Sequence, residues 1–194
     1  MLAARADLLH MLDALPDLPP GLRQTRVHGD YRLAQVLVAQ GDVMIIDLEG
    51  ETGRPLAARR AKTLPLIDVA GMIRSIDLAA WTSLSRFAET HSLALDRLIS
   101  PAATWRDLAV GAFMSGYRAG IEGCPSWPGM AAAETLLQWE LAARLGRELT
   151  RYSTAQPARV AAATAGLARL VQQLAPSGHG DVNGLSLPLD LDRS

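Results

Sequence analysis

Residues 26–51 constrain the fold more than any other stretch of the chain. Apolar runs at residues 36–39 and 43–47 flank the turn sequence at residues 40–42, Gln-Gly-Asp. Two β-branched runs around a Gly/Asp turn are typical of a β-hairpin. The segment before it, residues 28–35, follows neither the helical nor the strand period. We therefore expect an irregular loop that leads into a small hairpin, which folds the chain back on itself.

Most of the remaining chain has helical spacing. The apolar members of four such segments are Ile67, Ala70, Met72, Ile73, Ile76, Ala79 and Ala80; Trp105, Leu108, Ala109, Phe113 and Tyr117; Leu136, Leu137, Leu141, Leu145 and Leu149; and Val160, Leu167, Leu170, Val171 and Leu174. A further helix is expected at residues 2–14, and a polar loop at residues 49–63. The predicted class is α+β, a mostly helical body with a small β-hairpin. This domain would span residues 1–175 and be followed by a flexible tail at residues 176–194.

Charge and composition exclude several classes of function. The net charge is −1, so there is no general basic field for nucleic acid or an anionic membrane surface. Every long apolar stretch is interrupted before it reaches membrane-spanning length, and the first residues lack the pattern of a secretory signal. Cys124 is the only cysteine, which excludes a disulfide within the chain and a cysteine-based zinc site. These features predict a cytoplasmic protein without nucleic-acid or membrane partners.

Three polar residues around the predicted hairpin have the chemistry of phosphoryl transfer. Transfer to a hydroxyl needs a carboxylate that orients the nucleophile and accepts its proton, together with oxygen ligands for Mg²⁺. Asp30 suits the first task. The amide oxygen of Gln35 and the carboxylate of Asp47 suit the second, because Mg²⁺ takes a few hard oxygen ligands from protein. The alternative is an ordinary turn, with Asp30 in an Asx turn and Asp47 closing a strand.

The order of these residues is similar to the catalytic loop of protein kinases, in which an amide residue follows the catalytic aspartate and a second aspartate follows a strand pair. The surrounding motifs resemble the maltokinases more specifically. These motifs are His28-Gly29-Asp30-Tyr31, Asp47-Leu48-Glu49-Gly50-Glu51, Arg54-Pro55-Leu56, Arg59-Arg60-Ala61-Lys62 and Pro65-Leu66-Ile67-Asp68-Val69-Ala70-Gly71-Met72. The resemblance is close from about residue 26 to 81 and weaker beyond.

The resemblance to maltokinases implies a role for each candidate residue. Asp30 would be the catalytic base. Gln35 and Asp47 would bind the Mg²⁺ that accompanies ATP, with Glu49 as a further metal ligand. Arg32, where these kinases usually have histidine, would neutralise charge on the transferred phosphate. The alternative for Arg32 is a surface arginine without a catalytic role.

The resemblance also implies a fold and a reaction. Maltokinases transfer a phosphoryl group from ATP to maltose, which gives maltose 1-phosphate, and they have a protein-kinase-like fold. This chain would be the C-terminal lobe of that fold, with Asp68 at the start of the central helix accepting backbone N–H bonds from the catalytic loop. Because only 27 residues precede His28, we expect the N-terminal lobe that holds ATP to be missing from these 194 residues.

Several alternatives remain open at this point. The chain could instead be half of a glucosamine kinase or of an aminoglycoside kinase, because such kinases would use the same catalytic loop. It would otherwise be a catalytically inactive remnant of a kinase, or a module that only binds a sugar. A second chain would supply the missing lobe, or the sequence would be truncated from a longer reading frame. The apolar face that the lobe would cover would favour self-association.

Overall fold

The structure is a computed structural model, and it describes residues 20–91, 96–151 and 157–174. The helix expected at residues 2–14 and the tail expected at residues 176–194 lie outside these described residues. None of the described helices is long and apolar enough to cross a membrane.

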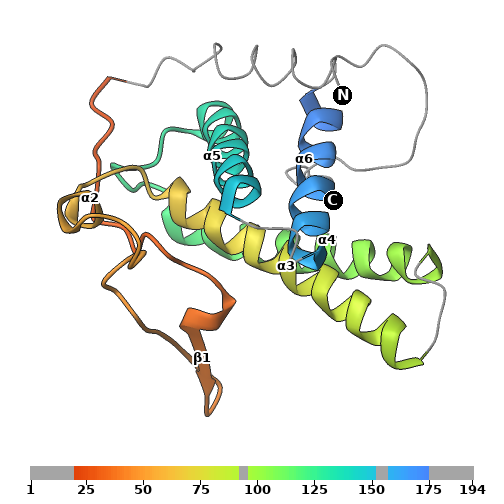
Figure 1. Cartoon of the computed structure of the whole chain (residues 1–194). Helices are drawn as coiled ribbons and strands as arrows, with labels where there is room; N and C mark the ends of the chain where they lie inside the picture. Colours follow the sequence, from red (N-terminus) through yellow and green to blue (C-terminus); the bar gives the residue numbers. More distant parts are fainter. Residues whose placement is uncertain (1–19, 92–95, 152–156, 175–194) are drawn as a thin grey trace.

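The described elements form a small hairpin and a helical body (Figure 1). In chain order they are the 3₁₀ turn η1 (Leu33–Gln35), the strands β1 (Val36–Ala39) and β2 (Asp42–Ile45), and the helices α2 (Leu56–Arg60), α3 (Leu66–His91), α4 (Asp96–Ile121), α5 (Met130–Arg151) and α6 (Pro157–Leu174). The hairpin and the four long helices predicted from the spacing are confirmed, and so is a mostly helical α+β class.

Helix α2 lies inside the segment at residues 49–63, which we expected to be a loop. Pro55 precedes the helix with φ of −54°, a value that suits entry into a helix. Ala57 and Ala58 favour the helix, and Arg59 and Arg60 lie in its last turn, where positive charge stabilises the helix dipole. A helix of five residues is too short to show a period, so the sequence pattern missed it.

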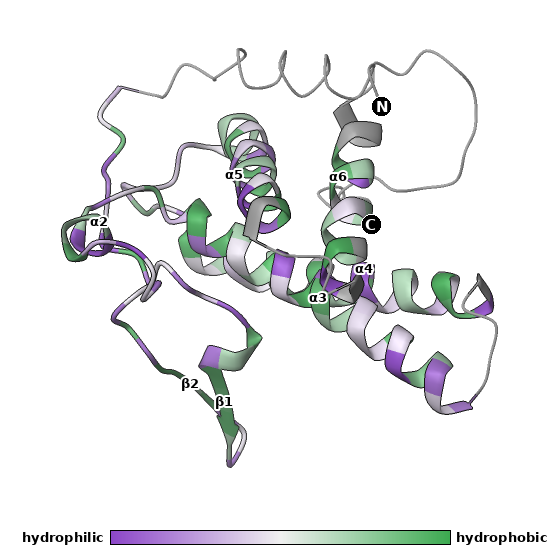
Figure 2. Ribbon diagram, viewed as in Figure 1, coloured by the Kyte–Doolittle hydropathy of each residue, from purple (hydrophilic) through white to green (hydrophobic). Residues whose placement is uncertain are grey.

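The hairpin is short and exposed. Val36 pairs with Ile45 in an antiparallel register, and the turn residues Gln40 and Gly41 have φ of 54° and 83°. Positive φ at both turn positions is typical of the type I′ turn, whose twist matches that of the two strands. Figure 2 shows that the strands are hydrophobic, yet Val38 is 75% exposed. A lone two-stranded hairpin with this exposure has little stability of its own.

Helix α3 is the centre of the helical body. It packs against α4, α5 and α6, and in Figure 1 it runs diagonally between them. Leu66, Val69 and Ile73 of α3 are at most 1% exposed, and they share one apolar core with Val110 of α4 and Leu145 of α5. Burial of these side chains is the main force that holds the helices together.

Charged residues are also buried between these helices. Arg74 Nη1 donates to Asp77 Oδ2 at 2.7 Å, and Arg106 Nε donates to Asp77 Oδ1 at 2.6 Å. Arg74 Nη2 also donates to Glu148 Oε2 at 2.8 Å. Burial raises the pKa of the Asp77 carboxyl, but Arg106, Arg74 and Arg169 outweigh burial and hold that pKa below its ordinary value. The ionised carboxylate therefore connects α3 with α4, while Arg74 connects α3 with α5.

Candidate active site

The loop before the hairpin is held by the first turn of α3. Asp68 Oδ2 accepts a hydrogen bond from the backbone N–H of His28 at 2.7 Å, and Asp68 Oδ1 accepts one from Gly29 at 2.8 Å. Burial raises the pKa of the Asp68 carboxyl, although both backbone N–H bonds act in the opposite direction. The supporting role expected for Asp68 is confirmed, because its carboxylate fixes two consecutive peptide units of the loop.

His28 connects the loop to the end of the hairpin. Its side chain is buried, and its Nε2 lies 2.8 Å from the carbonyl oxygen of Ile46. A carbonyl only accepts, so Nε2 carries the proton. The Nδ1 atom can then accept from the backbone N–H of Asp30, at 3.4 Å. One imidazole thus holds the start of the loop against the chain just before Asp47.

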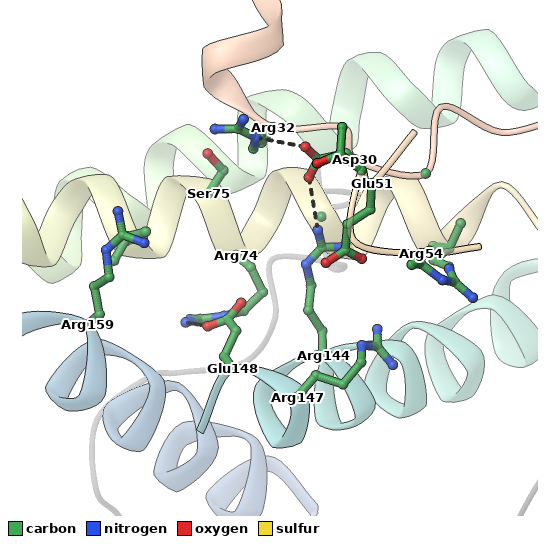
Figure 3. Close-up of a pocket in the computed structure, with 15 residues that line it drawn as sticks. Asp30, Arg32, Glu51, Arg54, Arg74, Ser75, Arg144, Arg147, Glu148 and Arg159 are labelled. Carbon is green, nitrogen blue, oxygen red and sulfur yellow. Dashed lines mark hydrogen bonds and ion pairs between the residues drawn. The ribbon is translucent and has the colours of Figure 1, made fainter. Parts of the chain in front are cut away.

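Asp30 lies between two arginines. Its Oδ2 accepts from Arg32 Nε at 3.1 Å, and its Oδ1 forms an ion pair with Arg144 Nη2 of α5 at 3.9 Å. Figure 3 shows both contacts. The carboxylate is one-quarter exposed, so it remains open to a ligand while the two guanidinium groups fix its orientation.

The close approach of the loop, α3 and α5 depends on Gly71. A Cβ atom at this position would lie 2.5 Å from the carbonyl oxygen of Tyr31 and 3.1 Å from Arg144 Nη1. The first distance is a backbone clash that a side-chain movement cannot relieve. Glycine at position 71 therefore lets the backbone after Asp30 rest on α3, and it leaves room for the guanidinium of Arg144.

Gln35 connects Arg32 with Asp47. Gln35 is buried, and its amide nitrogen donates to Asp47 Oδ2 at 2.7 Å while its amide oxygen accepts from Arg32 Nη2 at 3.2 Å. This orientation is the one that pairs each donor with an acceptor. Because Arg32 also donates to Asp30, the structure brings Asp30, Arg32, Gln35 and Asp47 together in one continuous chain of polar contacts.

The backbone at Asp47 has an uncommon conformation. Its φ is 59°, in the left-handed region that residues other than glycine seldom adopt. Strain of this kind tends to occur where a side chain has to be aimed at a functional position. Glu49 is exposed, and its backbone carbonyl accepts from Arg59 Nη1 at 3.2 Å. The structure does not bring Glu49 into the polar chain that contains Asp47.

A cavity of about 420 Å³ opens beside Asp30, between the loops and helices α3, α5 and α6 (Figure 3). Six arginines line it, namely Arg32, Arg54, Arg74, Arg144, Arg147 and Arg159. Its acidic lining residues are Asp30, Glu51 and Glu148. The metal candidates Gln35, Asp47 and Glu49 are not among the lining residues. Asp30 and Arg32 therefore belong both to the cavity and to the polar chain that ends at Asp47.

Sequence patterns do not predict the contacts of two residues that shape this site, Arg144 and His28. Arg144 lies far along the chain from Asp30, and only the packing of α5 on α3 brings the two together. His28 belongs to a sequence motif, but its hydrogen bond to Ile46 depends on how the hairpin returns. Within the described part of the chain, no three His, Cys, Asp or Glu side chains gather into a group that could hold a metal.

Comparisons with known proteins lead to glucosamine kinases. No protein-family model matches the chain. Over 113 residues, 58% of the chain and 23% of the relative, it is 29% identical to a glucosamine kinase of Streptacidiphilus jiangxiensis. A solved glucosamine kinase in crystal form B has a TM-score of 0.66 and 25% identity, over 86% of this chain and 37% of that one. A glucosamine kinase in complex with glucosamine, ADP and inorganic phosphate has a TM-score of 0.64 and 20% identity, over 88% and 46%.

The chain spans less than half the length of each of these relatives. The expected sugar-kinase-like character is supported, but the relatives are glucosamine kinases and not maltokinases. The described residues, mostly helical with one small hairpin, are consistent with the C-terminal lobe of a kinase-like fold. The chain thus shares its fold with part of the glucosamine kinases.

Proposed function

We propose that the chain is the part of an ATP-dependent sugar phosphotransferase that binds the acceptor sugar. The observation that carries the proposal is the polar chain from Asp30 through Arg32 and Gln35 to Asp47. It joins a carboxylate at the mouth of a cavity to a second carboxylate at the end of the hairpin. Phosphoryl transfer to a hydroxyl needs one carboxylate that accepts the hydroxyl proton and, close to it, oxygen ligands for Mg²⁺.

In this proposal, Asp30 is the residue that binds and deprotonates the reacting hydroxyl of the acceptor sugar. A sugar hydroxyl in the cavity would donate a hydrogen bond to its carboxylate, which would align the hydroxyl oxygen with the terminal phosphate of ATP. As the new oxygen–phosphorus bond forms and ADP leaves, the hydroxyl proton passes to Asp30. Arg32 and Arg144 hold the carboxylate in place, and Arg32 adds positive charge close to the transferred group.

Gln35 and Asp47 fit a Mg²⁺ ion by their donor atoms. If the Gln35 amide turned over, its oxygen would lie at the same 2.7 Å from Asp47 Oδ2. Both groups would then offer the hard oxygen atoms that Mg²⁺ takes from protein. When bound, Mg²⁺ would neutralise charge on the phosphates of ATP. Mg²⁺ needs only one or two protein carboxylates when phosphate and water complete its shell, so Glu49 would at most add a contact through water.

The exposed hairpin is the place where the nucleotide-binding part would attach. Its apolar side chains include Val38, Val43 and Met44, which are 75%, 58% and 61% exposed. An exposed apolar surface of this kind usually marks a site where another protein segment binds. We propose that a further segment, within a longer polypeptide or on a second chain, covers the hairpin and completes the ATP site. Without that segment, the same surface would favour self-association.

The comparisons favour a glucosamine-type kinase over a maltokinase, because the relatives carry that name. The maltokinase interpretation rests only on the motifs between residues 26 and 81. Both sugars therefore belong in the first test of the function.

The proposal is tested by incubating the chain, together with the segment that completes the ATP site, with ATP, Mg²⁺ and either glucosamine or maltose. Formation of a sugar phosphate is followed by ³¹P NMR. We expect Asp30→Asn to lower the rate by about 10²- to 10⁴-fold, the usual contribution of a general base. Asp42→Asn, an exposed change in the hairpin turn, is the matched control and should leave the rate unchanged.

Two results would contradict parts of the proposal. Undiminished turnover by Asp30→Asn would remove Asp30 from the reaction. Sugar binding without any sugar phosphate would favour the alternative of an inactive binding module.

A further inference from the structure

We propose that Arg32 controls the binding of a metal ion at Gln35 and Asp47, as a positioning residue that holds the Gln35 amide in the orientation that cannot bind a cation. A metal ion is bound by both residues only after Arg32 has given up its contact with Gln35. The inference rests on the proposed function, because it concerns the metal position of that site. It is carried by the donors and acceptors around the Gln35 amide, by the fixed backbone of Gln35 and by the exposure of Arg32.

The contacts of the Gln35 amide fix which of its ends faces Asp47. Gln35 is 5% exposed, so its amide has little access to water and needs partners within the protein. The amide nitrogen donates to Asp47 Oδ2 at 2.7 Å, and the amide oxygen accepts from Arg32 Nη2 at 3.2 Å. The NH₂ group therefore faces Asp47. An amide NH₂ group is a donor only, so Gln35 in this orientation is not a metal ligand.

Metal binding at this position requires the Gln35 amide to turn over. Mg²⁺ takes oxygen ligands, so the amide oxygen has to face the side of Asp47. The same rotation would place the NH₂ group 3.2 Å from Arg32 Nη2. Two donors would then face each other without an acceptor between them. A buried polar group that loses its partner costs free energy, so the contact with Arg32 opposes metal binding.

The backbone of Gln35 is held on both sides. Its N–H donates to the carbonyl oxygen of Arg32 at 2.9 Å, and its carbonyl oxygen accepts from the N–H of Ile46 at 3.0 Å. The first bond belongs to the 3₁₀ turn η1, in which side chains three residues apart lie above each other. The second bond holds the chain just before Asp47 beside Gln35. Rotation of the side-chain amide is therefore the movement that can exchange its donor for its acceptor.

The guanidinium group of Arg32 can leave Gln35 without leaving Asp30. The Arg32 side chain is 47% exposed, and it contacts Asp30 through a different atom, Nε, at 3.1 Å. Once Nη2 has given up the Gln35 oxygen, it needs a new acceptor. A phosphate group that arrives with the metal ion would be such an acceptor, because arginine binds phosphate oxygens strongly. A metal ion alone is therefore bound weakly, and a metal ion with phosphate is bound more tightly.

The inference is tested by titrating the full chain with Mn²⁺ alone, with the unbound ion measured by electron paramagnetic resonance. Arg32→Lys keeps the positive charge beside Asp30, but an ammonium group lacks the planar fork that contacts Asp30 and Gln35 together. We expect Arg32→Lys to bind Mn²⁺ about threefold to tenfold more tightly, the usual effect of one hydrogen bond. Arg86→Lys, at an exposed position of α3 that does not line the cavity, is the matched control and should bind Mn²⁺ like the unchanged chain.

A second measurement reports the orientation of the Gln35 amide itself. NMR follows the exchange of its side-chain NH₂ protons with solvent, and the loss of these signals in Gln35→Glu assigns them. Asp47→Gly removes the acceptor, and glycine suits the φ of 59° at this position. We expect about tenfold faster exchange in Asp47→Gly than in the unchanged chain, because one hydrogen bond to a charged group is lost. Equal exchange rates would show that the NH₂ group does not face Asp47, which would overturn the inference.

The Mn²⁺ titration separates failure of the inference from failure of the proposed function. Equal affinities of the unchanged chain and Arg32→Lys would overturn the inference. If Asp47→Gly still weakened the binding in that case, the proposed metal position would stand. An affinity for Mn²⁺ that Asp47→Gly does not lower, or no binding by either the unchanged chain or Arg32→Lys, would contradict the metal position of the proposed function, and the inference would fail with it.

Discussion

The loop that carries Asp30 and the hairpin that precedes Asp47 are neighbours in sequence, but they are held in opposite ways. The loop is tied to the helical body by Asp68 and rests on Gly71 of α3. The hairpin is supported at its base, where Val36 packs against the core and His28 contacts the carbonyl oxygen of Ile46, but every residue of β2 is exposed. The helical body therefore fixes the proposed base by itself, whereas the hairpin would need a further segment to cover it.

This difference separates the proposed site into two parts. The part that would bind the acceptor sugar is built on buried contacts within α3 and α5. The part that would bind metal and nucleotide depends on Gln35, on a strained Asp47 and on an uncovered hairpin. The contrast can be tested by changes that weaken one region and leave the other intact.

The largest effect is expected from breaking the buried charges of the helical body. Asp77→Ala would leave the guanidinium groups of Arg74 and Arg106 without their shared carboxylate. Removal of one partner of a buried ion pair costs about 3–5 kcal/mol of the free energy of unfolding. Urea denaturation measures the change. Asp42→Ala in the exposed turn is the control and should cost less than about 0.5 kcal/mol.

The same carboxylate predicts a pH dependence. The pKa of Asp77 is lower in the folded chain than its ordinary value, so the unfolded chain binds more protons between the two values. Its stabilising contribution is therefore complete above the ordinary pKa of about 3.9 and is lost as the pH falls through the folded pKa. Asp77→Asn should lack this acid-dependent loss. An equally steep decrease in the stability of Asp77→Asn below pH ~4 would contradict the assignment.

A smaller effect is expected from releasing the loop. Asp68→Ala removes both acceptors of the His28 and Gly29 backbone N–H groups, and we expect a loss of about 3 kcal/mol in the free energy of unfolding. Hydrogen exchange should show faster exchange of these two amides than in the unchanged chain. Slow exchange of both amides in the variant would show that other groups hold the loop.

Disturbing the close contact at Gly71 is expected to lower the free energy of unfolding by a smaller amount than releasing the loop. Gly71→Ala places a Cβ atom against the Tyr31 carbonyl oxygen, and overpacking of this kind costs about 1–3 kcal/mol. Gly146→Ala in α5 is the matched control, since its added Cβ would meet no atom within 4 Å. That control should stabilise the chain by up to about 1 kcal/mol through helix propensity. Equal melting temperatures for the two variants would contradict the close approach.

The smallest effect on folding is expected in the hairpin. Val38→Lys changes a side chain that is 75% exposed, so the free energy of unfolding should change by no more than about 0.5 kcal/mol. The change should nevertheless reduce concentration-dependent association, because it places a charge on the uncovered apolar strand. Sedimentation velocity measures this association. A large loss of stability would show that the hairpin is packed and not exposed.

Local chemistry explains which parts of the fold could be predicted. The hairpin depends on the turn residues Gln40 and Gly41 and on the adjacent apolar runs. It is therefore predictable from its own local sequence. The long helices show a repeated apolar period. The period did not show which apolar side chains are buried, since Trp105 and Leu108 of α4 are 50% and 70% exposed. A short helix such as α2 shows no period at all.

The candidate site was predictable to the extent that it is local. Asp30, Arg32, Gln35 and Asp47 lie close together in the sequence, and a hairpin between the last two necessarily brings them near each other. The role of Asp68 came from the resemblance to a family. Arg144 and the arginine-rich cavity depend on how α5 and α6 pack on α3, and no pattern in the sequence records that packing.

The central claim is that the loop and the hairpin form one site, with a metal position at Gln35 and Asp47 next to Asp30. Mn²⁺ takes the same hard oxygen ligands as Mg²⁺, and it broadens the NMR signals of nearby amides. Titration of the chain with Mn²⁺ and ADP should broaden the amide signals around Asp30 and around Asp47 together, and Asp47→Asn should abolish both effects. Broadening at only one of the two positions, or broadening that persists in Asp47→Asn, would contradict the claim.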